Sequence, residues 1–307
     1  MGSALNKTLL VTGLTGFVGQ HLQAFVDRPD AAWTLLLPPA PYDLTRAETL
    51  RQWCEQPPDA VIHLAGQTFV PEAFRDPART LEVNVLGTLN LLQALKAGGF
   101  SGRFLYVSSG DVYGQVAEAD LPIHEGLLPE PRNPYAVSKL AAEHLCLQWG
   151  ISEGWDVMVA RPFNHIGAGQ KDSFVMASAA SQIVRIAAGL QPPQLAVGDV
   201  DVSRDFLDVR DVIGAYFALL ESGKPGEVYN VCSAQEQSIR QLILTLAELA
   251  NVQVELVQDP ARMRRAEQRR VRASYSKLNT STHWAPSITI TQTLQSILSD
   301  WQSRGTQ

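Results

Sequence analysis

The chain has 307 residues and 45% apolar content, which suits one large globular domain or two coupled ones with a sizeable core. Its 25 Lys and Arg against 31 Asp and Glu give a net charge of −6, which argues against a general nucleic-acid binder because such a protein needs a basic surface. No apolar run approaches the ~20 residues of a membrane helix. We therefore expect neither a nucleic acid nor a membrane as partner.

The cysteines bear on compartment and metal content. Cys54, Cys146 and Cys232 lie far apart and form no CxxC pair. This spacing predicts no disulfide framework and no metal site, and it fits the reducing cytoplasm. The first residues, MGSALNK, lack an apolar signal core, so we expect a cytoplasmic protein.

Short apolar runs alternate with amphipathic segments through the first half of the chain. Strands are predicted at 7–13, 33–37, 59–66, 104–109 and 155–162, with helices at 17–27, 45–54, about 78–97 and 133–150. On the third of these helices we expect one apolar face made of Leu81, Val85, Leu89, Leu92 and Leu95. The alternation predicts βαβ units and a parallel sheet, and the continuous apolar strands agree because both faces of such a sheet are covered.

The alternation loosens in the second half. Residues beyond Pro162 are richer in loops, except that about 205–232 resembles a return to the sheet. We interpret two lobes. Residues 1–162 with that return segment form the first lobe, and residues 163–307 supply a smaller, discontinuous second lobe.

Three glycines, Gly13, Gly16 and Gly19, follow the first predicted strand and open the first predicted helix. Their spacing is GxxGxxG rather than GxGxxG. The physical reasons are the same: a tight turn, close approach of the backbone to a pyrophosphate, and a helix N-terminus that favours negative charge. Such a junction also occurs without a ligand, but here it begins a βαβ unit. The sequence therefore predicts a dinucleotide site in an α/β fold of the Rossmann type, a doubly wound parallel sheet.

The end of the second predicted strand bears on which dinucleotide is bound. NAD is commonly selected by an acid at this point, which binds the ribose 2′-hydroxyl. Here the run WTLLL is followed by Pro38 and Pro39. The missing acid favours NADP(H), or acceptance of both NADPH and NADH. Asp43 follows a few residues later and could either reach the adenine or cap the next helix.

Tyr135 and Lys139 form a YxxxK pair, whose spacing puts both side chains on one helix face. A lysine ammonium lowers the pKa of a nearby phenol from about 10 toward neutral pH, which would make Tyr135 a proton donor to a carbonyl being reduced. Upstream, Ser108, Ser109 and Asp111 follow a predicted strand, at the edge where doubly wound sheets bind ligands. Each pattern also arises as ordinary structure, but all three in this order are far more specific.

The chain resembles the extended short-chain dehydrogenase/reductases that act on nucleotide sugars. The resemblance is carried, between residues 7 and about 169, by VTGLTGFVG, HLAGQ, NVLGTLNLL, YVSSGDVYG, NPYAVSK and ARPFNHIG. It implies that Ser109 is the catalytic Ser/Thr, Tyr135 the general acid and Lys139 the lysine that binds the ribose. It also implies that Asn84 helps to order the site. The implied cofactor contacts are Gly13, Gly16, Phe17, Gly19, Asp43, Leu44, Leu64, Ala65, Tyr135 and Lys139.

The second lobe resembles enzymes of the GDP-mannose type. The resemblance implies phosphate contacts for Arg204 and Asn164, and within RRAE it implies that Arg264 binds the diphosphate and Glu267 a ribose. A guanidinium suits phosphate through its paired donors. The other arginines of DPARMRRAEQRRVR (259–272) are interpreted as a solvated face or as salt-bridge partners.

Over nearly the full chain the resemblance is to bacterial GDP-4-keto-6-deoxy-mannose reductases, which form GDP-D-rhamnose. It implies reduction of the C4 keto group of the GDP-sugar by NADPH, with NADH as a second reductant. Related dehydratases carry a glutamate that removes a C5 proton, whereas this chain has Ser109, Gly110 and Asp111 at that point. Asp111 is therefore assigned to the substrate, although an aspartate can also act as a base.

Several alternatives stay open. A 4,6-dehydratase or a 4-epimerase of the same family would keep a tightly held cofactor and need no net reductant, and a cofactor-binding protein would have lost the chemistry. His165, beside Asn164, could contact substrate or simply pack. The resemblance also implies a homodimer in which helices 78–97 and 134–149 pair across a twofold axis, although their apolar faces could equally be buried within the monomer.

Overall fold

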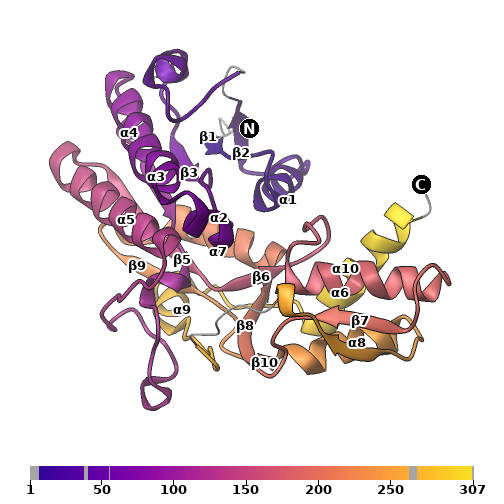
Figure 1. Cartoon of the computed structure of the whole chain (residues 1–307). Coiled ribbons are helices and arrows are strands. Elements are labelled where there is room, and N and C mark those ends of the chain that lie inside the picture. Colours follow the sequence, from indigo (N-terminus) through magenta and orange to yellow (C-terminus); the bar gives the residue numbers. More distant parts are fainter. Residues whose placement is uncertain (1–6, 38–40, 55, 263–267, 306–307) are drawn as a thin grey trace.

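A six-stranded parallel sheet lies at the centre of the first lobe in the computed structural model, which describes residues 7–37, 41–54, 56–262 and 268–305 (Figure 1). Every neighbouring pair of strands in it is parallel. The predicted α/β class with a doubly wound parallel sheet is therefore confirmed. In spatial order the strands are β2 (Trp33–Leu36), β1 (Lys7–Thr12), β3 (Ala60–His63), β4 (Arg103–Val107), β5 (Asp156–Pro162) and β9 (Val228–Val231).

The strand order reverses at β1, which pairs with β2 on one side and with β3 on the other. A doubly wound sheet binds its ligand in the crevice at such a switch point, beyond the carboxyl ends of the strands. A Cβ atom placed on Gly13, just after β1, would lie 2.9 Å from the backbone nitrogen of Ala65, just after β3. The two strand ends predicted to hold the cofactor therefore meet at this crevice.

Helices cover both faces of the central sheet. Leu9 and Val11 of β1 belong to the core on one face, and Leu10 between them belongs to the core on the other. This explains why the strands are apolar at successive positions. The helices on the first face are α1 (Phe17–Val26), α7 (Val209–Ser222) and α9 (Ser276–Thr282), and those on the second are the 3-10 helix η1 (Ala47–Cys54), α4 (Gly87–Ala97) and α5 (Pro134–Glu153).

The single helix expected at about 78–97 is interrupted. A π-helical turn adds one residue to the helical register, so the apolar face expected to run from Leu81 to Leu95 does not continue. Leu95 is buried but Leu81 is 41% exposed, and the polar Asn84 is buried within the π turn instead. The prediction of one uninterrupted apolar face is therefore wrong. The successive segments are α2 (Val70–Arg75), α3 (Pro77–Leu81), the π turn η2 (Glu82–Leu86) and α4.

The second lobe has its own core between three helices, α6, α8 and α10 (Figure 1). Ile183, Leu246 and Ile297, one from each helix, are fully buried there. The elements of this lobe are α6 (Val175–Ala187), α8 (Ile239–Leu249), α10 (Ile290–Gly305), a sheet of β10 (Glu236–Ser238), β8 (Ser203–Asp208) and β6 (Asn164–Ile166), and a pair of β11 (Glu255–Gln258) with β7 (Gln194–Val197).

The return segment at about 205–232 is shared between the two lobes. β9 joins the central sheet and α7 packs against α1, whereas β8 pairs with β6 and β10 in the second lobe. Conversely, α9 comes from the stretch assigned to the second lobe, yet it packs against α7 and β9, and its Leu278 is fully buried in the first lobe. The chain therefore crosses between the lobes more often than the loss of alternation suggests.

The same ranges also bear on membrane and metal binding. No helix there is long and apolar enough to cross a membrane. The described residues hold no group of His, Cys, Asp and Glu side chains that could bind a metal ion. Cys146 and Cys232 are free, buried thiols.

Candidate active site

The glycine turn after β1 is shaped by close backbone contacts. Gly13 has a φ of +81°, a conformation that side chains other than glycine rarely adopt. A Cβ atom on Gly19 would lie 2.3 Å from the carbonyl oxygen of Gly13 and 2.5 Å from the Cα of Leu14. Helix α1 begins after Gly16 with no acid in its first turn. The turn therefore suits a pyrophosphate, whose charge the helix N-terminus favours.

A buried chain of hydrogen bonds ties the carboxyl ends of β1 and β3 together. Thr88 of α4 donates its hydroxyl hydrogen to the carbonyl of Asn84 (2.7 Å), so it must accept from Nε2 of His63 (2.9 Å). Nδ1 of His63 then accepts from the Thr12 hydroxyl (2.6 Å), whose oxygen accepts from the amide of Ala65 (3.1 Å). Burial lowers the pKa of His63 to about 3, which keeps the ring neutral as this arrangement requires.

His63 was not among the predicted site residues. The signal for it was the histidine of HLAGQ, a polar residue at the end of an otherwise apolar strand. A fully buried polar side chain at a strand end requires partners, but the sequence does not show that they come from β1 and α4. His63 therefore fixes the Thr12 hydroxyl that accepts from the amide of Ala65, beneath the predicted cofactor crevice.

Asp43 caps a turn. Its Oδ1 accepts from the backbone amide (2.9 Å) and the hydroxyl (2.8 Å) of Thr45, and the backbone bond followed by the hydroxyl bond lowers the pKa of Asp43. Leu44 is buried, and its carbonyl accepts from Asn90 of α4 (2.8 Å). Asp43 therefore closes a turn that precedes η1 and does not cap that helix, which begins at Ala47, and an adenine contact stays a prediction.

Ser109 and Tyr135 meet at the carboxyl edge of the sheet. Ser109 follows β4 and begins the 3-10 helix η3 (Gly110–Tyr113), where its Oγ accepts from the amide of Asp111 (3.2 Å). Tyr135 stands in the first turn of α5, whose start is capped by Asn133, which accepts from the amide of Ala136 (2.8 Å). Tyr135 is buried and forms a side-chain hydrogen bond with Ser109.

The pKa of Tyr135 is raised in this environment, not lowered as predicted. Burial is the largest cause, the charge of Asp111 adds to it, and the bond with Ser109 opposes both. Burial dominates because removing a phenolate from water is costly, and the expected lowering by Lys139 is not among the causes of this shift. A neutral phenol is the form that can donate a proton, so this correction agrees with a general acid.

Lys139 lies one turn further along α5 and is buried. Its Nζ stands 4.5 Å from the ring centre of Tyr106 on β4. Burial lowers the pKa of Lys139 to about 8, and the charge of Glu143 acts in the opposite direction. Lys139 is therefore charged at neutral pH and loses its proton at mildly alkaline pH.

Asn84 connects the strand end after β3 with the helix that carries Tyr135. Its Oδ1 accepts from the amide of Gln67 (2.7 Å), and its Nδ2 donates to the Gln67 carbonyl (2.9 Å) and to Oγ of Ser138 (2.8 Å). Ser138 in turn donates to the carbonyl of Tyr135 (2.7 Å). The burial of a polar residue in the π turn is therefore explained by these three partners.

The predicted substrate residues fall into three groups. Arg204 of β8 lies near Asp111: burial lowers its pKa, and the charge of Asp111 opposes that shift. Asn164 is exposed at the start of β6. Arg264 and Glu267 lie outside the described residues. The charge of Asp111 therefore acts on both Arg204 and Tyr135.

His165 packs. Its ring stacks on Phe17 of the glycine turn, with ring centres 6.2 Å apart and planes at 4°, and its Nδ1 is 3.0 Å from the carbonyl of Phe163. Burial lowers the pKa of His165. Of the two roles left open for it, packing against the predicted cofactor loop is the one that the structure displays.

Three arginines of the basic run form ion pairs. Arg262 pairs with Asp259 (3.3 Å) and Arg269 with Asp199 (3.8 Å). Arg270 pairs with Glu236 (2.8 Å) and Glu118 (3.1 Å). The interpretation of these arginines as salt-bridge partners is confirmed, because each faces a carboxylate contributed by the folded chain.

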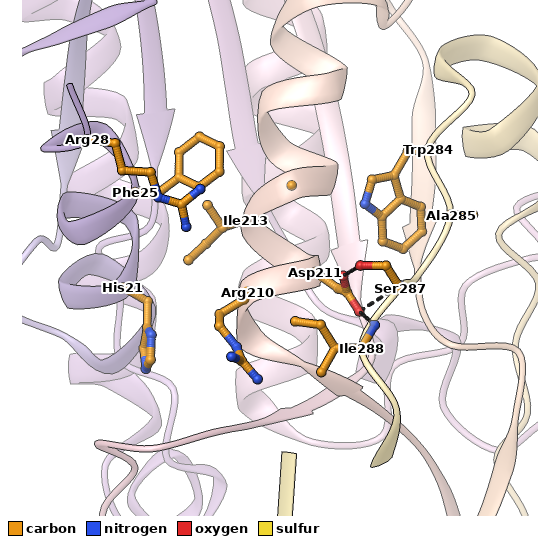
Figure 2. A pocket seen from close by; sticks show the side chains of 11 residues that line it. His21, Phe25, Arg28, Arg210, Asp211, Ile213, Trp284, Ala285, Ser287 and Ile288 are labelled. Atoms are coloured by element: carbon orange, nitrogen blue, oxygen red, sulfur yellow. Dashed lines mark hydrogen bonds between the residues drawn. The ribbon is translucent and has the colours of Figure 1, made fainter. Parts of the chain in front are cut away.

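A hollow between α1, α7 and the segment 284–288 offers no competing site (Figure 2). Two of its charged side chains, Arg210 and Asp211, already have partners within the chain. Arg210 binds both oxygens of Asp208, and Asp211 accepts from Ser287 and from the amide of Ile288. None of the predicted site residues lines this hollow.

A Rossmann-type sheet with a glycine turn at its switch point, and with Ser109, Tyr135 and Lys139 at one edge, defines an extended short-chain dehydrogenase/reductase. The chain belongs to the GDP-mannose 4,6 dehydratase family, which it matches over residues 40–297.

Particular relatives narrow the resemblance. GDP-6-deoxy-D-mannose reductase of Pseudomonas aeruginosa is 68% identical over 300 residues, which are 98% of this chain and 99% of that protein. GDP-6-deoxy-D-talose 4-dehydrogenase of Aggregatibacter actinomycetemcomitans is 30% identical over 260 residues, which are 82% of this chain and 83% of that protein. The solved structure of RMD from Pseudomonas aeruginosa complexed with NADPH has a TM-score of 0.94 and 68% identity, covering 97% of this chain and 99% of that one.

Proposed function

We propose that the protein is an NADPH-dependent reductase that converts GDP-4-keto-6-deoxy-D-mannose to GDP-D-rhamnose by reducing the C4 keto group. The observation that carries the proposal is the 68% identity, over 98% of the chain, to a GDP-6-deoxy-D-mannose reductase. The glycine turn, Ser109, Tyr135 and Lys139 supply the parts that such a reduction needs.

NADPH is the reductant, as in the solved relative. Residues that suit it are those of the glycine turn, where close backbone contacts leave room for a pyrophosphate but not for side chains. In this proposal the same crevice is lined by Phe17, Asp43, Leu44, Leu64 and Ala65. The reduced nicotinamide supplies the hydride, and Lys139 holds its ribose.

Tyr135 donates the proton to the C4 oxygen as negative charge develops there, and Ser109 donates a hydrogen bond to the same oxygen. Donors already aimed at that position stabilise the transition state without rearranging. The raised pKa of Tyr135 supports this role because the phenol stays protonated until the substrate oxygen requires the proton.

Product analysis tests the function. Incubation with GDP-4-keto-6-deoxy-D-mannose and NADPH should consume NADPH continuously, and NMR of the sugar should give the coupling pattern of D-rhamnose at C4. A dehydratase or 4-epimerase would need no net reductant. If the total NADPH consumed were far below the amount of substrate, one of those activities would be favoured. A product with the opposite configuration at C4 would show that the hydride reaches the other face of the C4 carbonyl.

For the GDP-sugar we propose that Asp111 and Asn164 orient the substrate, that Arg204 and Arg264 contact the diphosphate, and that Glu267 binds a ribose. The family pattern RRAE and the nearness of Arg204 to Asp111 support this assignment.

Arg264→Ala should raise the KM for the GDP-sugar by roughly tenfold to a hundredfold with little change in kcat, because a charged hydrogen bond of about 1.5–3 kcal/mol is lost equally from ground and transition states. Steady-state kinetics at saturating NADPH measure this. Arg269→Ala is the matched control, since Arg269 pairs with Asp199 and should leave the KM unchanged. Equal KM values for the two variants would move the diphosphate site elsewhere.

We further propose a homodimer formed by the surface of η2, α4 and α5. Leu86 on η2 is 52% exposed and Val137 on α5 is 44% exposed, and these two elements adjoin. Exposed apolar side chains that lie together indicate a surface that binds another protein. Leu86→Glu should shift the mass found by light scattering from dimer to monomer. Leu190→Glu changes a 67% exposed residue just after α6 in the second lobe, on none of these helices, and should leave the mass unchanged. A monomeric unaltered protein would end this proposal.

The buried free thiols of Cys146 and Cys232 fit a reducing compartment, so we place the activity in the cytoplasm. A disulfide found in protein isolated from cells under thiol-blocking conditions would argue against this location.

A further inference from the structure

A buried ion pair lies behind the catalytic helix. Two nitrogens of Arg161 on β5 donate hydrogen bonds to Glu143 of α5: Nε lies 3.0 Å from Oε1, and Nη2 lies 2.6 Å from Oε2. Both side chains are almost completely buried. Breaking such a pair on one side is costly, yet replacing the whole pair by uncharged groups often is not, so a buried pair needs a reason other than stability.

Glu143 lies on the face of α5 that carries Lys139. The two residues are four apart, so their side chains are neighbours one turn away from each other, and both are buried. The charge of the Glu143 carboxylate raises the pKa of Lys139, against the effect of burial. The other titratable groups near Lys139 are Tyr135 and Cys146 on α5, Tyr106 on β4 and His63 on β3.

Arg161 is held in place from the other side. Its guanidinium stands 4.8 Å from the ring centre of Tyr113, and the Tyr113 hydroxyl donates to Oδ1 of Asn230 on β9 (2.8 Å). Tyr113 belongs to η3, and Ser109 caps the start of the same helix. The pair is thus anchored to β5, β9 and the loop of the catalytic serine, and Glu143 cannot swing away from Lys139 without breaking two hydrogen bonds.

We propose that Glu143, held by Arg161, is a positioning residue that keeps Lys139 charged in its buried place, so that the ammonium can bind the nicotinamide ribose. This inference deepens the proposed function and rests on it for the role of Lys139. Arg161 fixes the position of the Glu143 side chain, and Glu143 in turn offsets the desolvation of Lys139. A purely structural pair would join α5 to β5 without affecting the charge on Lys139.

The directions of the pKa shifts agree with this arrangement. Burial lowers the pKa of Lys139 to about 8, and Glu143 opposes that shift. Burial raises the pKa of Tyr135, Tyr106 and Cys146, and it lowers that of His63 to about 3. Of these neighbours, Lys139 alone titrates near pH 8, so a midpoint there reports its charge.

The test is Glu143→Gln, with NADPH affinity measured by fluorescence between about pH 6 and pH 10. Lys139 is charged below its pKa, so NADPH affinity should fall as pH rises through that value. Removing the nearby negative charge should move this midpoint to lower pH by about one unit or more. The alkaline limb of kcat for GDP-sugar reduction should move in the same direction.

Glu153→Gln is the matched control. It removes the same charge from the same helix, but Glu153 pairs with Lys96 at the surface, so the midpoint should stay where it is. In the double variant Glu143→Gln with Arg161→Gln, no charge is left buried without a partner, and the midpoint should fall between those of the unaltered protein and the single variant.

Three outcomes would overturn the proposal. The first is a midpoint in Glu143→Gln equal to that of the control, and the second is NADPH affinity without a midpoint near pH 8 in the unaltered protein. The third is failure of both the single and the double variant to fold, which would make the pair a requirement of the fold. Normal NADPH titrations without turnover of the GDP-sugar would count against the proposed substrate alone.

Discussion

Replacing Tyr135 by phenylalanine should reduce kcat for GDP-sugar reduction by roughly 10²–10⁴-fold, the usual size of a general acid–base contribution. The change removes only the hydroxyl that bonds with Ser109, and the ring keeps its buried place at the start of α5. NADPH affinity should change little, because Lys139 and the glycine turn are untouched. Stopped-flow or steady-state loss of NADPH absorbance gives kcat, and fluorescence gives the affinity.

Tyr216→Phe is the control for this change. Tyr216 of α7 is also fully buried, and its hydroxyl has no hydrogen-bond partner among the described residues. Its loss should leave kcat within about twofold of normal, because the change breaks no hydrogen bond to a proposed catalytic group. If Tyr135→Phe retained comparable turnover, the proton donor would have to be another group, and Asp111 would be the first to examine.

Gly19→Ala should weaken NADPH binding by about tenfold to a hundredfold, which corresponds to the ~1–3 kcal/mol that overpacking typically costs. The added carbon would collide with the backbone of Gly13 and Leu14, and backbone cannot move aside as a flexible side chain can. The turn would have to widen just where it faces the pyrophosphate. Fluorescence titration with NADPH measures the effect, and thermal unfolding measures any accompanying loss of stability.

Gly214→Ala makes the same change inside another helix of the same face, α7. A Cβ atom there would lie 3.4 Å from Nε1 of Trp284, which is close to ordinary contact. NADPH affinity should be unchanged, and alanine's better helix propensity should offset the tighter packing. Equal affinities for NADPH in the two variants would mean that the turn at Gly19 does not shape the cofactor site.

Local spacing predicted much of the site. The glycines after β1 and the pair Tyr135 and Lys139 are close in sequence, so one turn or one helix brings them together, and the structure places them as the spacing indicates. Ser109 follows the end of β4, and parallel strands end at a common edge. These features could be predicted because each depends on a short stretch of chain.

Other features could not be predicted in this way. The π turn at η2 shifts the helix register and replaces the expected apolar face around Leu81 by a buried Asn84. No local pattern marks the extra residue in that turn. The turn is stabilised by hydrogen bonds that Asn84 forms with Gln67 and Ser138, which lie on other elements. The placement of α9 in the first lobe likewise depends on Leu278 finding the core beneath α7.

By itself, the sequence determined the class of fold, and it predicted the turn proposed for the cofactor and the proposed catalytic residues, because these follow from hydrophobic periodicity and from residues a few positions apart. Only the tertiary structure decided the protonation states. Burial raises the pKa of Tyr135 and lowers that of Lys139, and Glu143 opposes the latter shift from a pair with Arg161 that is 18 positions away. Desolvation and Coulomb energy depend on which groups surround a side chain in space, and that arrangement exists only once the helices have packed on the sheet.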